Sequence, residues 1–386
     1  MVKSVFISGI SGSIGEQTLE VLNNEYFKNN FHLIGGSVFS SWGKLKKIID
    51  KYDLKAVAVV DDSISIPETY NNCKIFKGLK SVENSIEYCK PDITLVATSG
   101  FSGIKHTIKA IEVSKRVCLA NKESVVCGGN FIFNYAKQYN CQIVPIDSEH
   151  SAIFQLLMGE KSTPTKIILT ASGGSLRDLP IEELENVSVQ RVLNHPVWSM
   201  GKRITIDSAS MVNKGLELFE AFYLFNVRDV EVAINRTSRI HSMVQFSDGV
   251  IKMHYGIANM KIPIAFSLSY PERKYTYGSP DLFSDKIEFY KVDYERYPAL
   301  QLAYSILGNP VLQNAFNAAD EVAVEYFLKD SIKFTDIYKV LEYTVNQMAT
   351  LSSRNKIFDF KEIDDILKID KNSREIAKKY IMEVIK

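Results

Sequence analysis

The chain has 386 residues, a formal net charge of +1 and 46% hydrophobic residues. This length suits two or three domains, each with a core of its own. The balanced charge leaves no basic stripe for nucleic acid and no polybasic arm for a membrane surface, which favours small molecules as partners. No apolar run is long enough to span a bilayer.

The five cysteines are an odd number and form no Cys-x-x-Cys pair. This pattern argues against a disulfide framework and against a zinc site, and it favours the reducing cytosol. Met1-Val2-Lys3 leads directly into an apolar segment, so we expect no signal or transit peptide. The predicted location is the cytoplasm, or the stroma of an organelle if a targeting segment has been removed.

Short apolar runs alternate with helical patterns over the first 147 residues. Periodicity predicts strands at 2–8, 31–36, 56–60, 93–97, 117–120 and 142–146, and helices at 14–23, 45–51, 104–113 and 124–139. Such alternation is typical of the α/β class with a doubly wound, Rossmann-like parallel sheet. Residues 1–147 are therefore expected to form a dinucleotide-binding domain.

The pattern changes after residue 147. Residues 148–270 combine a glycine-rich turn with strands at 166–170, 231–234, 240–246 and 250–255, which predicts an α+β domain. Residues 271–297 are rich in proline and tyrosine and suit a connector. Residues 298–386 show helical periods broken at Gly308-Asn309-Pro310, which predicts a small C-terminal helical bundle.

A glycine turn joins the first predicted strand to the first predicted helix. Gly9, Gly12 and Gly15 give the spacing G-x-x-G-x-x-G in the strand, turn and helix order that a dinucleotide site requires. Gly12 would bring the backbone close to a pyrophosphate, and a helix opening at Ser13 offers free N–H groups. A tight strand-to-helix turn without a nucleotide is the alternative.

The end of the second predicted strand bears on the choice of nucleotide. The segment Gly35 to Ser41 carries no carboxylate for the ribose hydroxyls of NAD. Its hydroxyl groups, with nearby Lys44, favour the 2′-phosphate of NADPH. Ser37 and Ser41 are equally suited to a turn and to a helix N-cap.

Two carboxylates follow the last strand of the predicted sheet. Asp147 and Glu149 would share a face, because residues two apart on an extended strand point the same way. Oxygen ligands alone favour Mg²⁺ or Mn²⁺ over zinc. Glu217 and Glu220 both have the spacing for a third ligand, and Glu217 is preferred because it shares a helical face with Lys214. A solvated strand end is the alternative for the pair.

A second polar cluster runs from Ser208 to Glu217. Asn213, Lys214 and Glu217 lie three or four apart, which puts an amide, an ammonium and a carboxylate on one helical face near an N-terminus. The Lys214 ammonium would pair with an anion, and a metal held by Asp147 and Glu149 would require a third ligand. A phosphorylated, metal-chelating substrate suits both. The segment Thr170 to Ser175 offers hydroxyl and N–H groups that can wrap a phosphate, although a plain turn fits equally.

A predicted loop at about 192–202 combines proline, tryptophan, methionine and glycine. A lid that closes over a substrate uses such residues. Trp198 would exclude water, Gly201 would bend and His195 would donate a hydrogen bond. A buried loop anchored by Trp198 is the alternative.

Taken in order along the chain, these motifs resemble the 1-deoxy-D-xylulose 5-phosphate reductoisomerase family. The resemblance is carried by residues 12–15, 120–124, 145–150, 172–174, 195–201, 207–217, 240–244, 294–298 and 317–321. It implies an NADPH- and metal-dependent enzyme of non-mevalonate isoprenoid synthesis, acting as a homodimer. The substrate would be isomerised by retro-aldol cleavage and aldol re-joining to an aldehyde, which NADPH reduces to 2-C-methyl-D-erythritol 4-phosphate.

The resemblance also implies residue roles. The metal would be held by Asp147, Glu149 and Glu217, with Lys122 completing the catalytic set. The expected substrate-binding residues are Lys122, Ser148, Glu149, Ser172, His195, Trp198, Ser208, Asn213, Lys214 and Glu217. Of these, Ser172, Ser208, Asn213 and Lys214, with His195, would take the phosphate end. The expected cofactor-binding residues are Ser11, Gly12, Ser13, Ile14, Ser40, Ser41, Asn121, Glu123 and Gly201.

Three segments depart from the usual pattern of the family. Ser11 replaces a common threonine, and Phe39-Ser40-Ser41 stands where a glycine with lysine or asparagine is frequent. Asn235-Arg236-Thr237-Ser238 replaces a typical His-Pro-Gln-Ser in a region associated with dimerisation.

Two other functions stay open. One is another metal-assisted, NADP-dependent dehydrogenase of a phosphorylated hydroxy compound, which would not rearrange carbon. The other is a non-catalytic NADPH-binding regulator. A regulator would be expected to have lost metal or lysine residues, whereas Asp147, Glu149, Glu217 and Lys214 are all present.

Overall fold

The computed structural model describes residues 2–194, 200–356 and 359–385, which form two compact units. The first unit consists of Met1–Ser124, Ile132–Ser151 and Asn259–Gly278, and the second of Val125–Phe131, Ala152–Ala258 and Ser279–Lys386. The units are defined by packing and are discontinuous along the chain. The four segments expected from the sequence therefore stay a prediction about functional organisation. Among the described helices, none is both long and apolar enough to cross a membrane.

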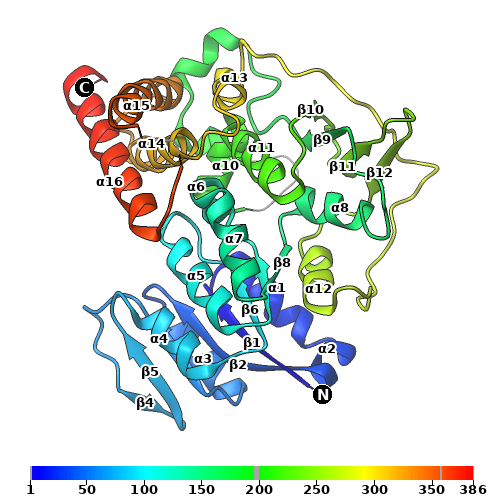
Figure 1. Cartoon of the computed structure of the whole chain (residues 1–386), viewed down its shortest axis with the longest axis vertical. Coiled ribbons are helices and arrows are strands. Elements are labelled where there is room, and N and C mark those ends of the chain that lie inside the picture. The colour runs from blue at the N-terminus through cyan, green and yellow to red at the C-terminus, as the bar shows by residue number, and fades with distance from the viewer. Residues whose placement is uncertain (1, 195–199, 357–358, 386) are drawn as a thin grey trace. The chain divides into compact units, whose positions relative to one another are not determined.

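An eight-stranded sheet forms the centre of the first unit (Figure 1). Its order is β4-β5-β3-β2-β1-β6-β7-β8, and every neighbouring pair is parallel except β4–β5. The strands are β1 (Lys3–Ser8), β2 (Phe31–Val38), β3 (Ala56–Val59), β4 (Thr69–Tyr70), β5 (Cys73–Lys77), β6 (Ile93–Val96), β7 (Arg116–Leu119) and β8 (Gln142–Pro145). The chain winds outward in both directions from β1, which confirms the predicted doubly wound sheet.

Helices cover this sheet, so the side chains of its strands are buried and apolar. Val5, Phe6 and Ile7 are completely buried, as expected for a parallel sheet covered on both faces. The helices of the unit are α1 (Ser13–Leu22), α2 (Glu25–Asn30), α3 (Trp42–Lys51), α4 (Ser81–Cys89), α5 (Gly103–Val113) and α12 (Lys261–Ser269). The unit boundaries fall within α6 (Lys122–Gly128), α7 (Asn130–Gln138) and α8 (Ser148–Leu156).

The single helix predicted at 124–139 is wrong, because the chain forms α6 and α7 with a break between them. Gly129 lies at the break with φ of +49°, where a side chain would be strained. A Cβ atom there would also approach the Tyr223 hydroxyl to 3.1 Å.

Helix α12 belongs to the first unit although it follows most of the second in sequence. It packs against α1, β7 and β8. The Arg116 guanidinium on β7 donates hydrogen bonds to the carbonyls of Ser267, Leu268 and Tyr270 at 3.2, 2.9 and 2.8 Å. These contacts hold the end of α12 to the sheet.

The second unit combines a four-stranded sheet with a group of helices (Figure 1). The sheet order is β10-β9-β11-β12, with β9 (Lys166–Ala171), β10 (Val230–Ile234), β11 (Ile240–Gln245) and β12 (Ile251–Tyr255). The helices are η1 (Ile181–Asn186), α9 (Val189–Val192), α10 (Lys202–Ala209), α11 (Val212–Phe225), α13 (Pro298–Ser305), α14 (Pro310–Leu328), α15 (Phe334–Asn355), α16 (Ile363–Tyr380) and η2 (Ile381–Ile385). The strands and the C-terminal bundle lie where the sequence predicts them.

Candidate functional site

The glycine turn between β1 and α1 has the backbone geometry of a close strand-to-helix connection. A Cβ atom on Gly15 would lie 2.5 Å from the carbonyl oxygens of Gly9 and Ile10, so only glycine fits there. Gly12 is the N-cap of α1 and has no side chain to satisfy the first N–H groups of the helix. Ser11, Ser13 and Ile14 are exposed or half-buried around this helix start. The turn therefore suits an anionic group at a helix N-terminus.

Ser37 at the end of β2 is buried, whereas Ser40 and Ser41 after the strand are exposed. The Ser37 hydroxyl is buried and accepts a hydrogen bond from the Gly9 amide at 3.1 Å, so it stabilises the glycine turn. Ser40 and Ser41 are exposed, and Ser41 is the N-cap of α3 without a side-chain cap hydrogen bond. The Lys44 ammonium lies 2.8 Å from the Glu16 carboxylate on the surface. The exposed hydroxyls thus remain accessible to a phosphate group.

Asn121 and Glu123 connect the loop after β6 to the start of α6. The Asn121 amide donates to the carbonyls of Thr98 and Gly100 at 2.8 and 2.9 Å, and to the Glu123 carboxylate at 2.7 Å. The other oxygen of Glu123 accepts from the Gly100 amide at 2.9 Å. Both side chains are buried, so in this structure they fix the loop that faces the end of the sheet.

The acidic pair does not lie on a strand. Strand β8 ends at Pro145 and α8 begins at Ser148, so the predicted shared strand face of Asp147 and Glu149 is wrong. Asp147 instead precedes the helix, and its Oδ1 accepts a hydrogen bond from the Glu149 amide at 3.3 Å. Glu149 lies in the first helical turn, where the helix dipole favours a negative charge. The Ser148 hydroxyl donates to the Glu149 carboxylate.

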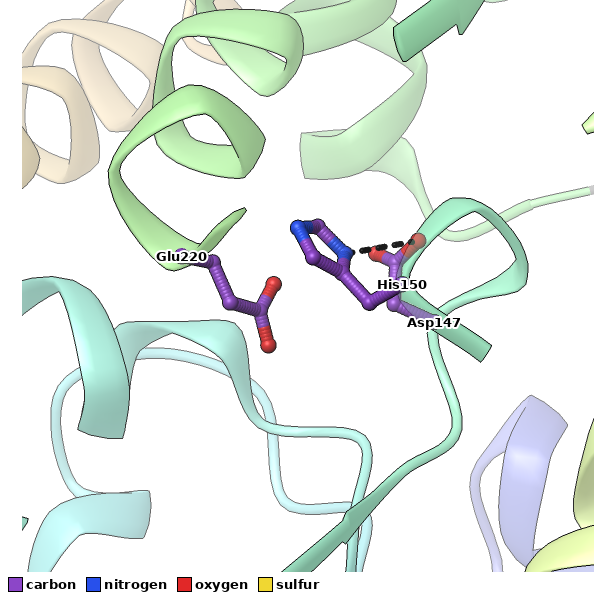
Figure 2. Close-up of side chains that lie close together, drawn as sticks. All are labelled: Asp147, His150 and Glu220. Carbon is purple, nitrogen blue, oxygen red and sulfur yellow. Dashed lines mark ion pairs between the residues drawn. The ribbon is translucent and has the colours of Figure 1, made fainter. Parts of the chain in front are cut away.

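Two basic groups hold the Asp147 carboxylate in its charged form. The Lys122 ammonium lies 2.7 Å from Oδ2. His150 Nδ1 lies 3.6 Å from Oδ1 (Figure 2). Burial alone would raise the pKa of Asp147, but Lys122 and His150 together lower that pKa well below 3.8. No role was predicted for His150; its position three residues after Asp147, in the first turn of α8, was the available signal.

Helix α11 presents the predicted face of amide, ammonium and carboxylate. The Asn213 amide donates to one oxygen of Glu217, and the Lys214 ammonium donates to the other at 2.5 Å. The same ammonium donates to the carbonyl of Thr170 at 2.5 Å. Lys214 and Glu217 are 4% and 1% exposed, so each charge compensates the other in a buried setting.

The turn after β9 lies beside α10 in the same unit. Gly174 has φ of +74°, and a Cβ atom there would lie 2.6 Å from the carbonyl oxygen of Ser208. The Ser172 hydroxyl accepts from the Gly174 amide at 3.1 Å. The structure thus brings Ser172, Ser208 and Lys214 to one region of the second unit, as an anion site requires.

The segment predicted to form a lid is described only in part. His195 and Trp198 lie outside the described residues, and Gly201 is the exposed N-cap of α10. Arg203 in the first turn of α10 was not singled out in the sequence. Its guanidinium reaches Asp320 and Glu321 of α14 at 3.1 and 3.0 Å. No local spacing signals these contacts, because the partners are 117 and 118 residues away.

Sequence comparison matches three family profiles to the chain. Residues 5–129 match 1-deoxy-D-xylulose 5-phosphate reductoisomerase, 143–225 match the C-terminal domain described under the same name, and 255–376 match the DXP reductoisomerase C-terminal domain. The chain is similar to 1-deoxy-D-xylulose 5-phosphate reductoisomerase of Thermotoga neapolitana, with 43% identity over 365 residues and 94% of each chain covered. It is 41% identical to that of Pseudothermotoga lettingae, over 100% of this chain and 99% of the relative.

Solved structures agree with these matches. A DOX-P reductoisomerase in complex with NADPH, fosmidomycin and magnesium aligns with a TM-score of 0.88 and 32% identity, covering 99% of this chain and 98% of that chain. The 1-deoxy-D-xylulose 5-phosphate reductoisomerase from Zymomonas mobilis in complex with NADPH aligns with a TM-score of 0.86 and 31% identity, covering 100% of both chains.

Proposed function

The chain belongs to the 1-deoxy-D-xylulose 5-phosphate reductoisomerase family, and we propose that its two polar clusters bind the metal and the substrate of that reaction. It is an NADP-dependent oxidoreductase of isoprenoid biosynthesis that converts 1-deoxy-D-xylulose 5-phosphate to 2-C-methyl-D-erythritol 4-phosphate, with NADPH and a divalent metal. The observation that carries the residue assignment is Asp147, a carboxylate kept ionised beside Lys122 and His150.

The proposed metal ligands are Asp147, Glu149 and Glu217. Three carboxylates suit Mg²⁺ or Mn²⁺, which prefer oxygen ligands. Asp147 is ionised beside Lys122, and the buried Glu217 is paired with Lys214. A bound cation would compensate the two negative charges in place of these lysines. A bound metal would supply Lewis-acid stabilisation of negative charge on the substrate's carbonyl and hydroxyl oxygens. Glu220 is the alternative third ligand.

The proposed phosphate site consists of Ser172, Ser208, Asn213 and Lys214, with His195 from the lid segment. Support comes from the close approach of the turn after β9 to Ser208, and from Lys214 donating to the Thr170 carbonyl. Lys122 and Ser148 would donate hydrogen bonds to the oxygens on the rearranging carbons. Phosphate binding far from those carbons supplies energy for closing a lid that includes Trp198.

The proposed NADPH site begins at the turn between β1 and α1, with Ser11, Gly12, Ser13 and Ile14. Ser40 and Ser41 would take the 2′-phosphate, and their exposure supports this role. Asn121, Glu123 and Gly201 complete the set. The side chains of Asn121 and Glu123 would act by fixing the loop at 98–100 against the cofactor.

The proposed assembly is a homodimer formed through the edge of the second sheet. Strand β12 is the last strand in the sheet order and exposes Ile251 by 46% and Met253 by 44%. In the segment after α12, Leu282 and Phe283 are 69% and 101% exposed, and Asp285 of the same segment accepts a hydrogen bond from the Tyr255 hydroxyl of β12 at 2.7 Å. An apolar sheet edge of this kind favours pairing with another chain. The proposed location is the cytoplasm, because the five cysteines are free thiols in buried positions.

One assay separates this reaction from the alternatives. The protein is incubated with 1-deoxy-D-xylulose 5-phosphate, NADPH and Mg²⁺, and the loss of NADPH absorbance is followed together with the product's carbon skeleton. A branched product is expected. An unbranched reduced product would instead indicate a metal-assisted dehydrogenase without rearrangement, and NADPH binding without turnover would indicate the regulator.

The metal assignment has a test that does not depend on turnover. Binding of Mn²⁺ to the protein without substrate is measured by electron paramagnetic resonance for the wild type and for Asp147→Asn. Weaker binding by the variant is expected, with Asp248→Asn as an exposed control that binds as the wild type does. Equal affinity in all three would remove Asp147 from the ligand set.

A further inference from the structure

A hollow of about 200 Å³ lies in the second unit, outside the residues assigned to the reaction. Four basic side chains line it, Arg177, Arg236, Lys291 and Arg296, together with Tyr290 and Asp293. A water molecule in the liquid takes up about 30 Å³. The hollow, hereafter the basic hollow, therefore has room for several waters or for one small anion.

Positive charge exceeds negative charge around the basic hollow. Asp293 is the carboxylate in its lining, and Asp178 lies beside it. Asp178 is shared, with its oxygens 3.3 Å from Arg177 Nε and 2.9 Å from Arg236 Nη1. Four cationic groups thus face these two carboxylates, and they still outnumber the carboxylates when Glu288, whose Oε2 lies 3.0 Å from the Tyr290 hydroxyl, is counted. Concentrating like charges in a recess raises the local potential and attracts small anions.

The arginines are held in place by contacts that use only part of their hydrogen-bonding capacity. Arg177 Nη1 donates to the carbonyl of Ser172 at 2.7 Å, and Arg296 Nη1 donates to that of Leu176 at 3.0 Å. The Arg236 guanidinium lies 5.1 Å from the centre of the Tyr290 ring. A guanidinium carries five N–H donors in a rigid fork that matches the oxygens of phosphate. Fixed forks of this kind are suited to bind a phosphate with little loss of side-chain entropy.

The basic hollow is connected to the turn after β9 through two side chains. Arg177 donates to the Ser172 carbonyl, and the Tyr297 hydroxyl donates to the Gly173 carbonyl at 2.9 Å. The hydroxyl of Ser172 belongs to the proposed substrate-phosphate site and accepts from the Gly174 amide of the same turn. An anion that draws on Arg177 would therefore change how firmly the turn is held.

We propose that the basic hollow is a second anion site, which binds a small phosphate or diphosphate group and is coupled through Arg177 to the substrate-phosphate turn. Anion binding itself is independent of the proposed function. The coupling rests on the proposed phosphate role of Ser172. By linkage, an anion in the basic hollow and the substrate change each other's affinity by the same factor.

The binding test uses the full chain, inorganic diphosphate as the probe, and isothermal titration calorimetry without metal. Arg236→Gln combined with Lys291→Gln is expected to weaken diphosphate binding by tenfold or more. Lys161→Gln combined with Arg228→Gln removes the same charge at exposed positions elsewhere and is expected to keep the wild-type affinity. Inorganic phosphate is titrated in parallel to show whether one phosphate group suffices. Circular dichroism melting confirms that each variant is folded.

Two outcomes would overturn the proposal. The first is equal diphosphate affinity in the hollow variant and in the wild type, including no binding by either. The second is loss of binding only in Lys214→Met, which would place the anion at the substrate site. Turnover is read separately, so an inactive wild type that still binds diphosphate would reject the proposed function and leave the anion site standing.

The coupling has its own readout. Diphosphate is expected to change KM for the substrate in the wild type and in the Lys161/Arg228 control, beyond any change in the hollow variant. Equal changes in all three proteins would mean that diphosphate acts only by competing at the substrate site, and the coupling would be rejected.

Discussion

Opposing influences act on the single carboxyl group of Asp147. Burial favours the neutral form, whereas the Lys122 ammonium at 2.7 Å and the neighbouring His150 favour the charged form. The effect of Lys122 and His150 on the pKa is larger than that of burial, so the carboxyl group stays ionised. Glu149 is placed two residues further on by the first turn of α8, where Ser148 donates to its carboxylate. The two carboxylates thus differ in surroundings although they are close in sequence.

Replacement of Glu149 by glutamine keeps the size of the side chain and removes one negative charge. We expect turnover to be abolished and Mn²⁺ binding to weaken, while NADPH binding stays nearly intact. Turnover is followed by NADPH absorbance and cofactor binding by fluorescence titration. Glu182→Gln, at an exposed position in η1, serves as the matched control. Normal turnover of Glu149→Gln would exclude this residue from the site.

The buried His106 makes stability depend on pH. Its Nδ1 lies 3.1 and 3.2 Å from the hydroxyls of Ser8 and Thr98, and burial lowers its pKa from 6.5 to about 4. Between these values the unfolded state binds a proton that the folded state does not, so the free energy of unfolding falls as the pH falls. The loss from this group begins below about pH 6.5, reaches about 3 kcal/mol near pH 4 and then levels off.

Urea unfolding of the wild type and of His106→Gln between pH 4 and pH 7 measures this contribution. The variant is expected to lose less stability than the wild type over that range. Parallel pH dependences would mean that His106 titrates alike in both states. Because His106 contacts residues at the end of β1 and after β6, the same side chain also helps to fix the sheet beside the glycine turn.

Helix α10 is held partly by contacts that are distant in sequence. Arg203 is 21% exposed in its side chain and contacts Asp320, which is completely buried, and Glu321. Glu321 is contacted in turn by Arg374 of α16 at 2.6 Å. This chain of ion pairs connects α16, α14 and α10, and α10 carries Ser208 in its last turn.

Removal of the guanidinium in Arg203→Met would leave the Asp320 carboxylate buried beside fewer positive charges. We expect the free energy of unfolding to fall by about 3 kcal/mol, since breaking a buried ion pair from one side is costly. Urea unfolding measures this loss, and Arg191→Gln at an exposed position of α9 is the control. We also expect KM for the substrate to rise more than KM for NADPH, because α10 contributes to the phosphate site. A variant as stable as the wild type would show that the ion pairs contribute little.

Predictability from sequence follows the range of the interactions involved. The α11 face of Asn213, Lys214 and Glu217 was predictable because helical spacing is local and regular. The local structure around Asp147 and Glu149 was not predictable, because an apolar pattern does not show whether the strand continues through Asp147 or ends at Pro145. The break at Gly129 depends on space beside Tyr223, and the partners of Arg203 depend on helix packing. Contacts of this kind produce no periodic pattern in the sequence.

On the scale of the whole molecule, the exposed edge of β12 bears on assembly. Met253→Lys places a charge on an apolar edge and is expected to shift the protein from dimer to monomer. Light scattering coupled to size exclusion measures the mass. Leu79→Lys, at a position 85% exposed in the first unit, should leave the dimer intact. A monomeric wild type, or a dimeric Met253→Lys protein, would contradict the proposed interface.

The late position of α12 in the sequence matters when the protein is made on the ribosome. Ile264, Ala265 and Leu268 of α12 belong to the same apolar core as Val5 and Ile7 of the first strand. At typical rates of translation, the strands of the first sheet precede α12 by on the order of ten seconds. During that interval the nascent sheet lacks part of its cover, which makes it a candidate for binding by a chaperone. A fragment ending at residue 147 would keep this defect permanently.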